Sequence, residues 1–349
     1  MKIDRRSVLV GVGASAAAAI CPTAARSAGC EVDADTRCRI FDSSKTITRT
    51  ASKMADAGAR SVLRFYSRQK NLDPHLGPYQ NEVLTTDELK AIEDAGLSVA
   101  TVFQYFSGGS GRTFHDDKKK INDVAEALAF ADRMKQPEHS TLYFGADFPL
   151  KPDDETVVKQ YFEYAMQEMS RYSKTWKIGV YGCGKTCEIL SAEGWDIDCW
   201  ISASVSFWHT AEFFNSGNWT LFQTKTELSR SFGGIDTNIL NPKRTSFGQW
   251  RSDGKPVGEP IAISQKIRDH RRFIQVPRLQ LFPDPRPVNP IALTGLDASR
   301  ALKGRSVRVL CAQGDFVGVS FDETDTLLGY CKASDLGATI PHFSQDWER

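Results

Sequence analysis

TLYFGAD at residues 141–147 and KIGVYG at residues 177–182 are two short apolar runs with a helix-like stretch between them. Within that stretch Val158, Phe162 and Ala165 recur at the spacing of one helical face. A buried strand, a helix and a second buried strand in this order are typical of a parallel sheet. The same alternation continues in both directions along the chain, so this unit decides the fold class.

Short apolar runs alternate with helix-like stretches from residue 38 to about residue 240. The predicted strands are Arg39–Asp42, Ser61–Tyr66, Ser98–Gln104, Thr141–Asp147, Lys177–Gly182, Cys199–Ser202, Thr220–Thr224 and Gly234–Asn238. Thr85 and Glu88 form a capping box ahead of one intervening helix. Eight strands interleaved with helices predict an α/β fold, a (β/α)8 TIM-like barrel. A doubly wound open sheet is the alternative, because alternation alone does not establish closure.

Polar residues collect where these predicted strands end. In a barrel of this class the active site lies at the C-terminal ends of the strands, so these side chains are candidates for a site. A single polar residue there is often only a turn former or a helix cap, but polar residues at all eight strand ends indicate convergence. The residues are Asp42, Arg64, Tyr66, Gln104, Asp147, Tyr181, Ser202, Gln223, Asp236 and Asn238.

Residues 1–28 have the composition and order of an export signal. Basic Lys2, Arg5 and Arg6 precede an apolar run at 8–20 that is too short to span a bilayer, and small residues follow. DRRSVL at 4–9 resembles the twin-arginine signal, so we expect export to the periplasm, the cell wall or the medium. Residues 27–30 are half of a lipoprotein cleavage box, which leaves a lipid anchor at Cys30 as an alternative.

Charge and cysteine usage exclude several classes of partner. A formal net charge of +1 gives no global field that would recruit nucleic acid or an anionic membrane. Beyond the N-terminus no apolar run reaches about 18 residues, so no transmembrane span is expected. Scattered histidines and the lack of paired CxxC motifs predict no metal site and no cofactor. In an oxidising compartment, Cys311 and Cys331 are the favoured disulfide pair.

Several motifs, taken together and in order, resemble a bacterial glycoside-hydrolase-like barrel family, a domain of unknown function related to barrel-type lysozymes. The resemblance covers residues 37–245, and no single motif in it is specific. The motifs are Phe41-Asp42, Leu63-Arg64-Phe65-Tyr66, Leu84-Thr85 with Glu88, Ala95-Gly96-Leu97, Phe103-Gln104, Tyr143-Phe144-Gly145-Ala146-Asp147-Phe148, Gly179-Val180-Tyr181-Gly182, Trp200, Gln223 and Asp236-Thr237-Asn238.

The resemblance implies a sugar-binding cleft with acids at the strand ends. Asp42, Asp147 and Asp236 match the acidic positions and are the predicted catalytic residues. Glycosidic cleavage uses one carboxylic acid as a proton donor and a second carboxylate that stabilises, attacks or activates water. The predicted substrate-binding residues are Arg64, Tyr66, Gln104, Tyr181, Trp200, Gln223 and Asn238.

One position departs from the lysozyme pattern. The lysozymes carry Asp-x-Glu after the fourth strand, with the Glu as proton donor, whereas this chain has Asp147-Phe148-Pro149. Proline cannot transfer a proton. Either Asp147 donates the proton itself, or Asp153 or Asp154 reaches the site, or the barrel binds glycan without cutting it.

A rival motif is GVYGCGKT at 179–186, which satisfies the GxxxxGK[ST] phosphate-loop pattern. Because Gly179 sits inside an apolar run, little loop remains to wrap a phosphate. Nucleotide binding is therefore a weaker interpretation than glycan hydrolysis or glycan binding. Lys185 is the residue on which it depends.

Behind the barrel, residues 246–274 predict a linker or a strap, and residues 275–338 predict a small β-domain. Its expected strands are Arg278–Phe282, Ser306–Cys311, Phe316–Phe321 and Leu327–Lys332. This piece resembles bacterial SH3-like domains, which implies binding of a peptidoglycan peptide. The sequence therefore predicts a secreted glycosidase acting on peptidoglycan or another cell-surface glycan, with a non-catalytic glycan-binding protein as the alternative.

Overall fold

A computed structural model describes residues 40–56, 58–67, 82–104, 114, 116–172, 174–204, 207–225, 235–241, 243–255, 257, 271–321 and 327–338. The expected export signal at 1–28 and the cysteine at position 30 lie outside these residues. Among the described helices none is long and apolar enough to cross a bilayer.

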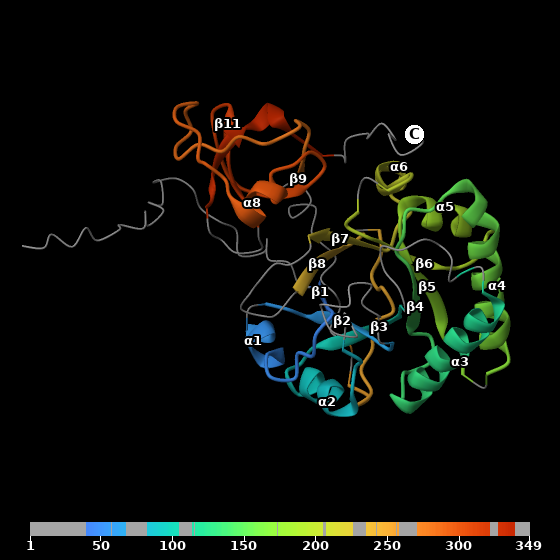
Figure 1. Ribbon diagram of the computed structural model, residues 1–349. Coiled ribbons are helices and arrows are strands. Elements are labelled where there is room, and N and C mark those ends of the chain that lie inside the picture. The colour runs from blue at the N-terminus through green and yellow to red at the C-terminus, as the bar shows by residue number, and fades with distance from the viewer. Residues whose placement is uncertain are drawn as a thin grey trace, which may run out of the picture.

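Eight strands form a closed barrel, so the open-sheet alternative is wrong (Figure 1). They are β1 Ile40–Ser43, β2 Ser61–Phe65, β3 Ser98–Phe103, β4 Thr141–Ala146, β5 Lys177–Gly182, β6 Asp198–Ile201, β7 Leu221–Lys225 and β8 Ile235–Leu240. The helices around them are α1 Ala51–Asp56, α2 Thr86–Asp94, α3 Asp117–Arg133, α4 Glu155–Ser170, α5 Gly184–Ala192 and α6 Thr210–Ser216.

The last strand departs from the predicted (β/α)8 pattern. Strands β1 to β7 are parallel neighbours, but β8 runs antiparallel to both β7 and β1. Only nine residues, 226–234, separate β7 from β8, and a parallel crossover needs a dozen or more. The start of β8 therefore lies at the C-terminal ends of the other strands. We call this end of the barrel the rim.

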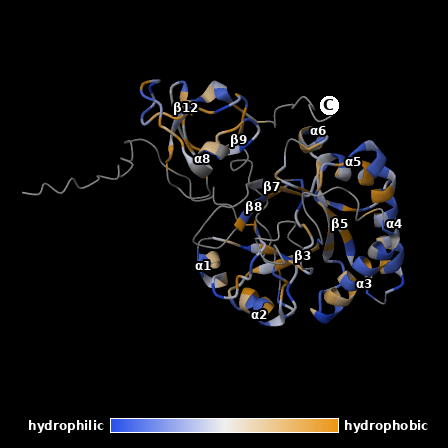
Figure 2. Cartoon of the chain, in the orientation of Figure 1, coloured by the Kyte–Doolittle hydropathy of each residue, from blue (hydrophilic) through white to orange (hydrophobic). Residues whose placement is uncertain are grey.

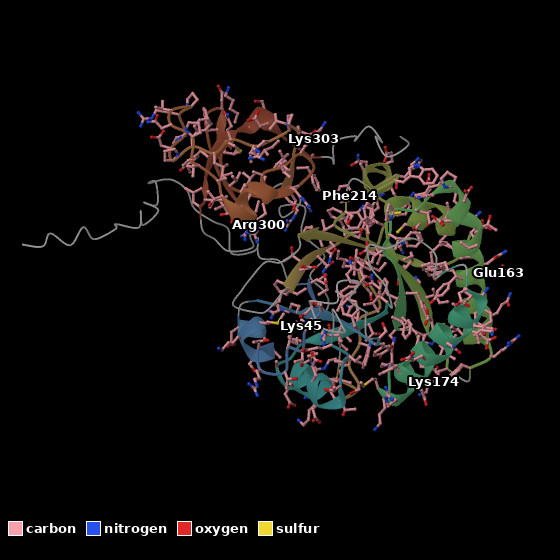
Figure 3. The ribbon with its side chains drawn as sticks, viewed as in Figure 1. Lys45, Glu163, Lys174, Phe214, Arg300 and Lys303 are labelled. Carbon is pink, nitrogen blue, oxygen red and sulfur yellow. The ribbon has the colours of Figure 1, made fainter. Side chains whose placement is uncertain are left out.

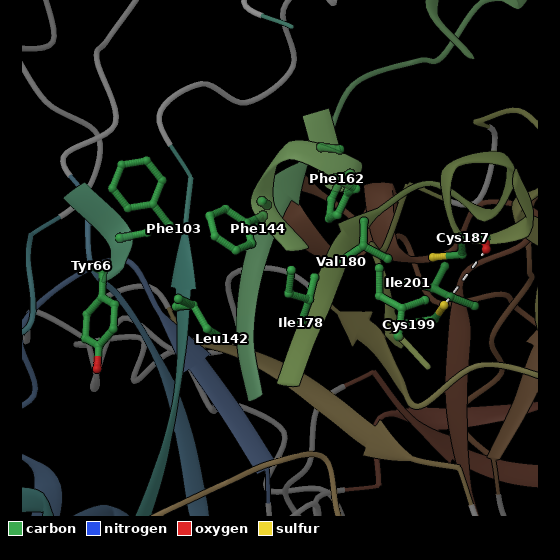
Figure 4. Close-up of a cluster of buried hydrophobic side chains, with 14 of the residues drawn as sticks. Tyr66, Phe103, Leu142, Phe144, Phe162, Ile178, Val180, Cys187, Cys199 and Ile201 are labelled. Atoms are coloured by element: carbon green, nitrogen blue, oxygen red, sulfur yellow. Dashed lines mark hydrogen bonds between the residues drawn. The ribbon is translucent and has the colours of Figure 1, made fainter. Parts of the chain in front are cut away.

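The apolar core has two layers. The outward side chains of the strands pack against the helices, as Phe144, Val180 and Ile201 do in Figure 4. In Figure 2 the strands carry much of the hydrophobic colour, whereas the helices α3 and α4 are largely hydrophilic outside. A second cluster fills the barrel interior, and it includes Leu63 and Tyr143.

The first part of the predicted linker is a strap across the N-terminal end of the barrel. The Tyr143 hydroxyl donates to the Phe247 carbonyl at 2.9 Å, and Trp250 pairs with Val99 as an isolated bridge. Gly248 has φ +76°, and an added Cβ there would lie 1.9 Å from Thr141 Oγ1. This floor closes the barrel below the rim.

A separate antiparallel sheet follows, in the order β12-β11-β10-β9-β13. Its elements are β9 Arg271–Ile274, α8 Gly295–Arg300, β10 Ser306–Gln313, β11 Phe316–Ser320, β12 Gly329–Lys332 and β13 Leu336–Gly337. The predicted first strand, Arg278–Phe282, is wrong: it makes only isolated bridges, to Leu302 and Tyr330, and β9 takes its place. The SH3-like assignment stays a prediction.

The sheet contacts the barrel beside β7. The ring of Phe273 in β9 lies 5.2 Å from that of Phe214 in α6 and 6.1 Å from that of Phe222 in β7. Ser306 Oγ donates to the Thr224 carbonyl at 3.0 Å. Figure 3 labels Phe214 in α6 of the barrel, Arg300 at the end of α8 and Lys303 in the turn that follows α8.

The predicted disulfide between Cys311 and Cys331 is wrong. Cys331 is a buried free thiol. Strand β11 separates the two cysteines, since Cys311 pairs with Gly318 and Cys331 with Val317. Two strand spacings amount to about 9.5 Å, whereas a disulfide joins Cα atoms at most about 7 Å apart. Cys183, Cys187 and Cys199 are also free and buried.

Candidate active site

The three predicted catalytic acids meet at the rim. Asp42 lies in β1, Asp147 directly follows β4, and Asp236 is the second residue of β8. Because β8 is reversed, Asp236 pairs with Asp42 in register. Tyr181 of β5 lies among them: burial raises the pKa of its hydroxyl well above the usual value, and the charges of all three acids raise that pKa further.

Two amide side chains hold the carboxylates. Gln223 Nε2 donates to Asp42 Oδ1 and Oδ2 at 3.2 and 3.1 Å, and to Asp236 Oδ2 at 2.9 Å. Asn238 Nδ2 donates to Asp42 Oδ2 at 2.7 Å. Asp42 and Asp236 are therefore bridged by one amide nitrogen, which stabilises both as carboxylates.

A second set of contacts fixes how those amides are turned. The Tyr181 hydroxyl and the Ala203 backbone N–H donate to Gln223 Oε1 at 3.0 and 3.1 Å. Trp200 Nε1 donates to Asn238 Oδ1 at 2.8 Å. With their oxygens occupied in this way, both amides present N–H groups to the acids.

Burial raises the pKa of two of the acids into the range of acid–base catalysis. The pKa of Asp42 rises to about 6, chiefly because the carboxyl is buried; the bonds from Asn238 and Gln223 oppose this rise, and the charge of Asp147 adds to it. Burial also raises the pKa of Asp147 to about 6, against the opposing influence of the Ser202 and Tyr181 hydroxyls. Each acid can therefore hold or release a proton in mildly acidic water.

Arg64 and Tyr66 are not at the acids, contrary to the prediction. Arg64 is fully buried and its Nε and Nη2 donate to Glu88 Oε1 and Oε2 at 2.7 and 3.1 Å, while Nη1 donates to the Ser43 carbonyl. Its charge lowers the pKa of Asp42. Tyr66 is also fully buried and donates to Gln136 Oε1 at 2.8 Å. Both residues are structural.

Glu88 is the buried ion-pair partner of Arg64. Thr85 Oγ1 accepts from the Glu88 backbone N–H at 3.2 Å, as the capping box predicts. The Glu88 carboxylate binds Arg64 and the Ile47 backbone N–H instead of returning to the cap. It is thus a buried charge partner, and the helix-start motif gave no sign of that role.

Gln104 and Trp200 are inward-facing but buried, at 2 % and 1 % exposure. The Gln104 side chain lies across Gly145, where an added Cβ would come 2.4 Å from Gln104 Cγ. Trp200 packs against Tyr181 in a tilted arrangement with ring centroids 4.1 Å apart, and its burial leaves little surface for a sugar ring. Of the predicted binding residues, Gln223 and Asn238 donate directly to the acids. Tyr181 and Trp200 orient those two amides.

The segment after Asp147 shows what replaces the lysozyme acid. Phe148 is buried at 5 % exposure, whereas Pro149 and Asp153 are exposed. Asp154 Oδ2 accepts from the Lys151 backbone N–H at 3.0 Å and so closes its own turn. Asp147 is the residue of this segment that joins the other acids.

The phosphate-loop interpretation is wrong. Gly179 lies within β5, where an added Cβ would come 2.3 Å from Tyr143 Cδ1. At the start of α5 the backbone N–H of Gly184 donates to Thr210 Oγ1 and that of Lys185 to the Trp208 carbonyl, both at 2.9 Å. Lys185 Nζ lies 3.1 Å from Glu188 Oε2. The amides and the lysine that would hold a phosphate are already engaged.

Among the described residues, no group of three or more His, Cys, Asp or Glu is arranged to hold a metal ion.

Comparison with known proteins gives a match to one family. The model of the Rv2525c-like, glycoside hydrolase-like domain matches residues 52–240. Protein FadG of Bacillus subtilis strain 168 is 25% identical over 202 residues, which are 56% of this chain and 34% of FadG. The chain thus spans about a third of that relative.

Two solved structures are similar in backbone. The Tat-secreted protein Rv2525c of Mycobacterium tuberculosis, in complex with L-tartrate, has a TM-score of 0.49 and 18% identity, over 60% of this chain and 98% of that one. The glycosyl hydrolase 25 protein GHIP of Streptococcus pneumoniae has a TM-score of 0.39 and 12% identity, over 60% of this chain and 89% of that one.

Proposed function

The chain belongs to the Rv2525c-like, glycoside hydrolase-like domain family, and from this premise we propose that it cleaves peptidoglycan or another cell-surface glycan with the acids at its rim. The observation that carries the proposal is the joint position of Asp42, Asp147 and Asp236 around Tyr181. Glycoside hydrolysis needs two carboxyl groups with different roles at one place.

Asp147 is the proton donor in this mechanism. Its raised pKa of about 6 leaves a protonated fraction in mildly acidic water, and among the described residues no amide N–H donates to its Oδ1. The proton passes to the glycosidic oxygen as the bond between that oxygen and the anomeric carbon breaks. A water molecule then forms a new bond to the anomeric carbon and gives a proton back to the carboxylates of the rim, which restores the starting state. Asp147 then has the role of the lysozyme glutamate, so the site keeps a proton donor although Pro149 stands at the position of that glutamate.

Asp42 is the ionised partner. Burial raises the pKa of Asp42 to about 6 as well, but its two oxygens accept three hydrogen bonds from Gln223 and Asn238, which oppose that rise and favour the carboxylate over the acid. A fixed negative charge beside the sugar ring stabilises the positive charge that develops on the anomeric carbon. Asp236, joined to Asp42 through Gln223, adds to the same field.

Non-catalytic glycan binding is the second candidate function, and Pro149 is the observation that favours it. Under that alternative the same acids accept hydrogen bonds from sugar hydroxyls and transfer no proton. The two functions share one site and differ in whether Asp147 is ever a donor.

Export and attachment complete the proposal. The basic start and the DRRSVL motif at 4–9 support export by the twin-arginine route, with a lipid anchor at Cys30 as the alternative. The separate C-terminal sheet, proposed to be SH3-like, would bind a peptidoglycan peptide and place the rim on the cell wall.

The test is release of reducing ends from purified peptidoglycan by the mature chain, starting near residue 29. We expect release near pH 6, its loss in Asp147→Asn, and its retention in Asp153→Asn, which alters an exposed acid of the same segment. Sedimentation with peptidoglycan but no release between pH 4 and pH 8 would establish the binding alternative. Neither binding nor release would refute both.

A further inference from the structure

Two buried polar atoms at the rim have no hydrogen-bond partner within the described part of the chain: Asp147 Oδ1 and Ser202 Oγ. Ser202 is 1 % exposed. Buried side-chain oxygens in folded proteins are nearly always hydrogen-bonded, so each exception calls for an explanation. Here the two exceptions occur in the same small region.

The strand order brings these atoms together. Asp147 directly follows β4 and Ser202 directly follows β6, and both strands are neighbours of β5, which carries Tyr181. Trp200 and Tyr181 belong to the interior cluster, and strand alternation gives Ser202 the same inward direction as Trp200. The Ser202 hydroxyl faces the Asp147 carboxyl closely enough to lower its pKa as a hydrogen-bonding group does, although neither Ser202 Oγ nor Asp147 Oδ1 makes a hydrogen bond of normal geometry.

The backbone around Ser202 is held by hydrogen bonds, whereas its side-chain oxygen has no hydrogen bond of normal geometry. The Ser202 backbone N–H donates to the Gly182 carbonyl at 2.9 Å, and the next N–H, of Ala203, donates to Gln223 Oε1 at 3.1 Å. The backbone thus holds the hydroxyl beside Asp147, although its Oγ makes no hydrogen bond of normal geometry to the described residues. Such an arrangement is characteristic of a group that serves a ligand.

We propose that Ser202 Oγ and Asp147 Oδ1 together form a subsite for one neutral hydroxyl group. A hydroxyl donates one hydrogen bond and accepts others, so it can satisfy a serine and a carboxyl at once. An anion would be repelled by the three aspartates. The hydroxyl is that of water in the free protein and, on the premise of the proposed function, that of a sugar or of the hydrolytic water in the complex.

Ser202 is therefore a positioning residue for the hydroxyl that meets the proton donor. Ser202→Ala should fold normally, because Ser202 Oγ makes no hydrogen bond to the described protein. Loss of one hydrogen bond should weaken glycan binding roughly fivefold to tenfold. Since the hydroxyl opposes the rise of the Asp147 pKa, its removal should raise that pKa further above about 6.

The first experiment is a high-resolution crystal structure of the mature wild-type protein and of Ser202→Ala, both without glycan. We expect one ordered oxygen within hydrogen-bond distance of both atoms in the wild type and its loss or displacement in the variant. A wild-type structure in which Ser202 Oγ bonds to a protein atom, or in which no oxygen is ordered there, would overturn the subsite. This test needs no enzymatic activity, so its result is separable from that of the proposed function.

The second experiment identifies the source of the hydroxyl and tests the titration. A complex with a peptidoglycan oligosaccharide shows either a sugar hydroxyl in place of the ordered oxygen or a retained water. An NMR titration of Asp147 should give a higher pKa in Ser202→Ala and a value near the wild type in Ser202→Thr, which restores a hydroxyl. An unchanged pKa in Ser202→Ala would contradict the proposed contact, because a purely structural serine would also leave it unchanged.

Discussion

Replacing Asp147 by Asn should stabilise the protein at neutral pH while abolishing hydrolysis. The pKa of the Asp147 carboxyl is about 6 in the fold, against 3.8 for an ordinary aspartate. One pKa unit corresponds to about 1.4 kcal/mol, so ionising Asp147 in the fold costs up to about 3 kcal/mol more than in the unfolded chain. Asparagine has a similar shape and carries no charge, so it removes that cost.

The sign of the effect depends on pH. A carboxyl whose pKa is higher in the fold binds its proton more tightly there, so the wild type loses this part of its stability as the pH rises from about 4 through about 6. The advantage of Asp147→Asn should therefore be near zero at pH 4 and reach about 1–3 kcal/mol at pH 7.5. Activity and stability are opposed at this residue, as they often are at catalytic sites.

Urea unfolding followed by tryptophan fluorescence measures the difference. Six of the seven tryptophans lie between residues 176 and 250, so the signal reports on the barrel and its strap. Asp153→Asn is the matched control, and the exposed position predicts little change at either pH. An Asp147→Asn variant no more stable than the wild type at pH 7.5 would refute the argument that burial holds a costly charge at this position.

Three further predictions concern the same site. The rate of glycan hydrolysis should be bell-shaped in pH with a maximum near 6, because Asp147 must hold a proton while its partner carboxylate must have lost one; a flat profile would count against this pairing. Arg64→Ala should destabilise the fold by about 3–5 kcal/mol in thermal or urea unfolding, because Glu88 would be left buried and unpaired; a stable variant with weak glycan binding would instead restore Arg64 as a ligand contact. Gly145→Ala should cost about 1–3 kcal/mol by the same measurement, because the new methyl group overlaps the Gln104 side chain, and an unchanged midpoint would contradict that contact.

The sequence identified the strands and the acids because both carry strong local signals. Each buried strand is an apolar run, and Asp42 and Asp147 directly end such runs. Closure of the barrel depends on pairing between β1 and β8, which are about 190 residues apart, and no local pattern encodes it. The direction of β8 did have a signal, since nine residues cannot form a helical crossover.

The misassigned residues have a common physical cause. Strand β2 is buried on both faces, so its apolar and polar residues do not alternate in a way that shows which face is the interior. Leu63 and Phe65 belong to the interior cluster, and the side chains between and after them, Arg64 and Tyr66, point toward the helices. Alternate residues of a strand point into the barrel and toward the helices. A polar residue at a strand end can therefore belong to the site only if it is one of those that point inward.

A crystal structure of the mature Asp147→Asn protein with a peptidoglycan-derived oligosaccharide would test the central claim most directly. We expect an intact glycan across the rim, with a glycosidic oxygen within hydrogen-bond distance of residue 147 and a sugar ring beside Asp42. A glycan bound only to the C-terminal sheet, or a rim that stays without sugar at saturating concentration, would contradict it.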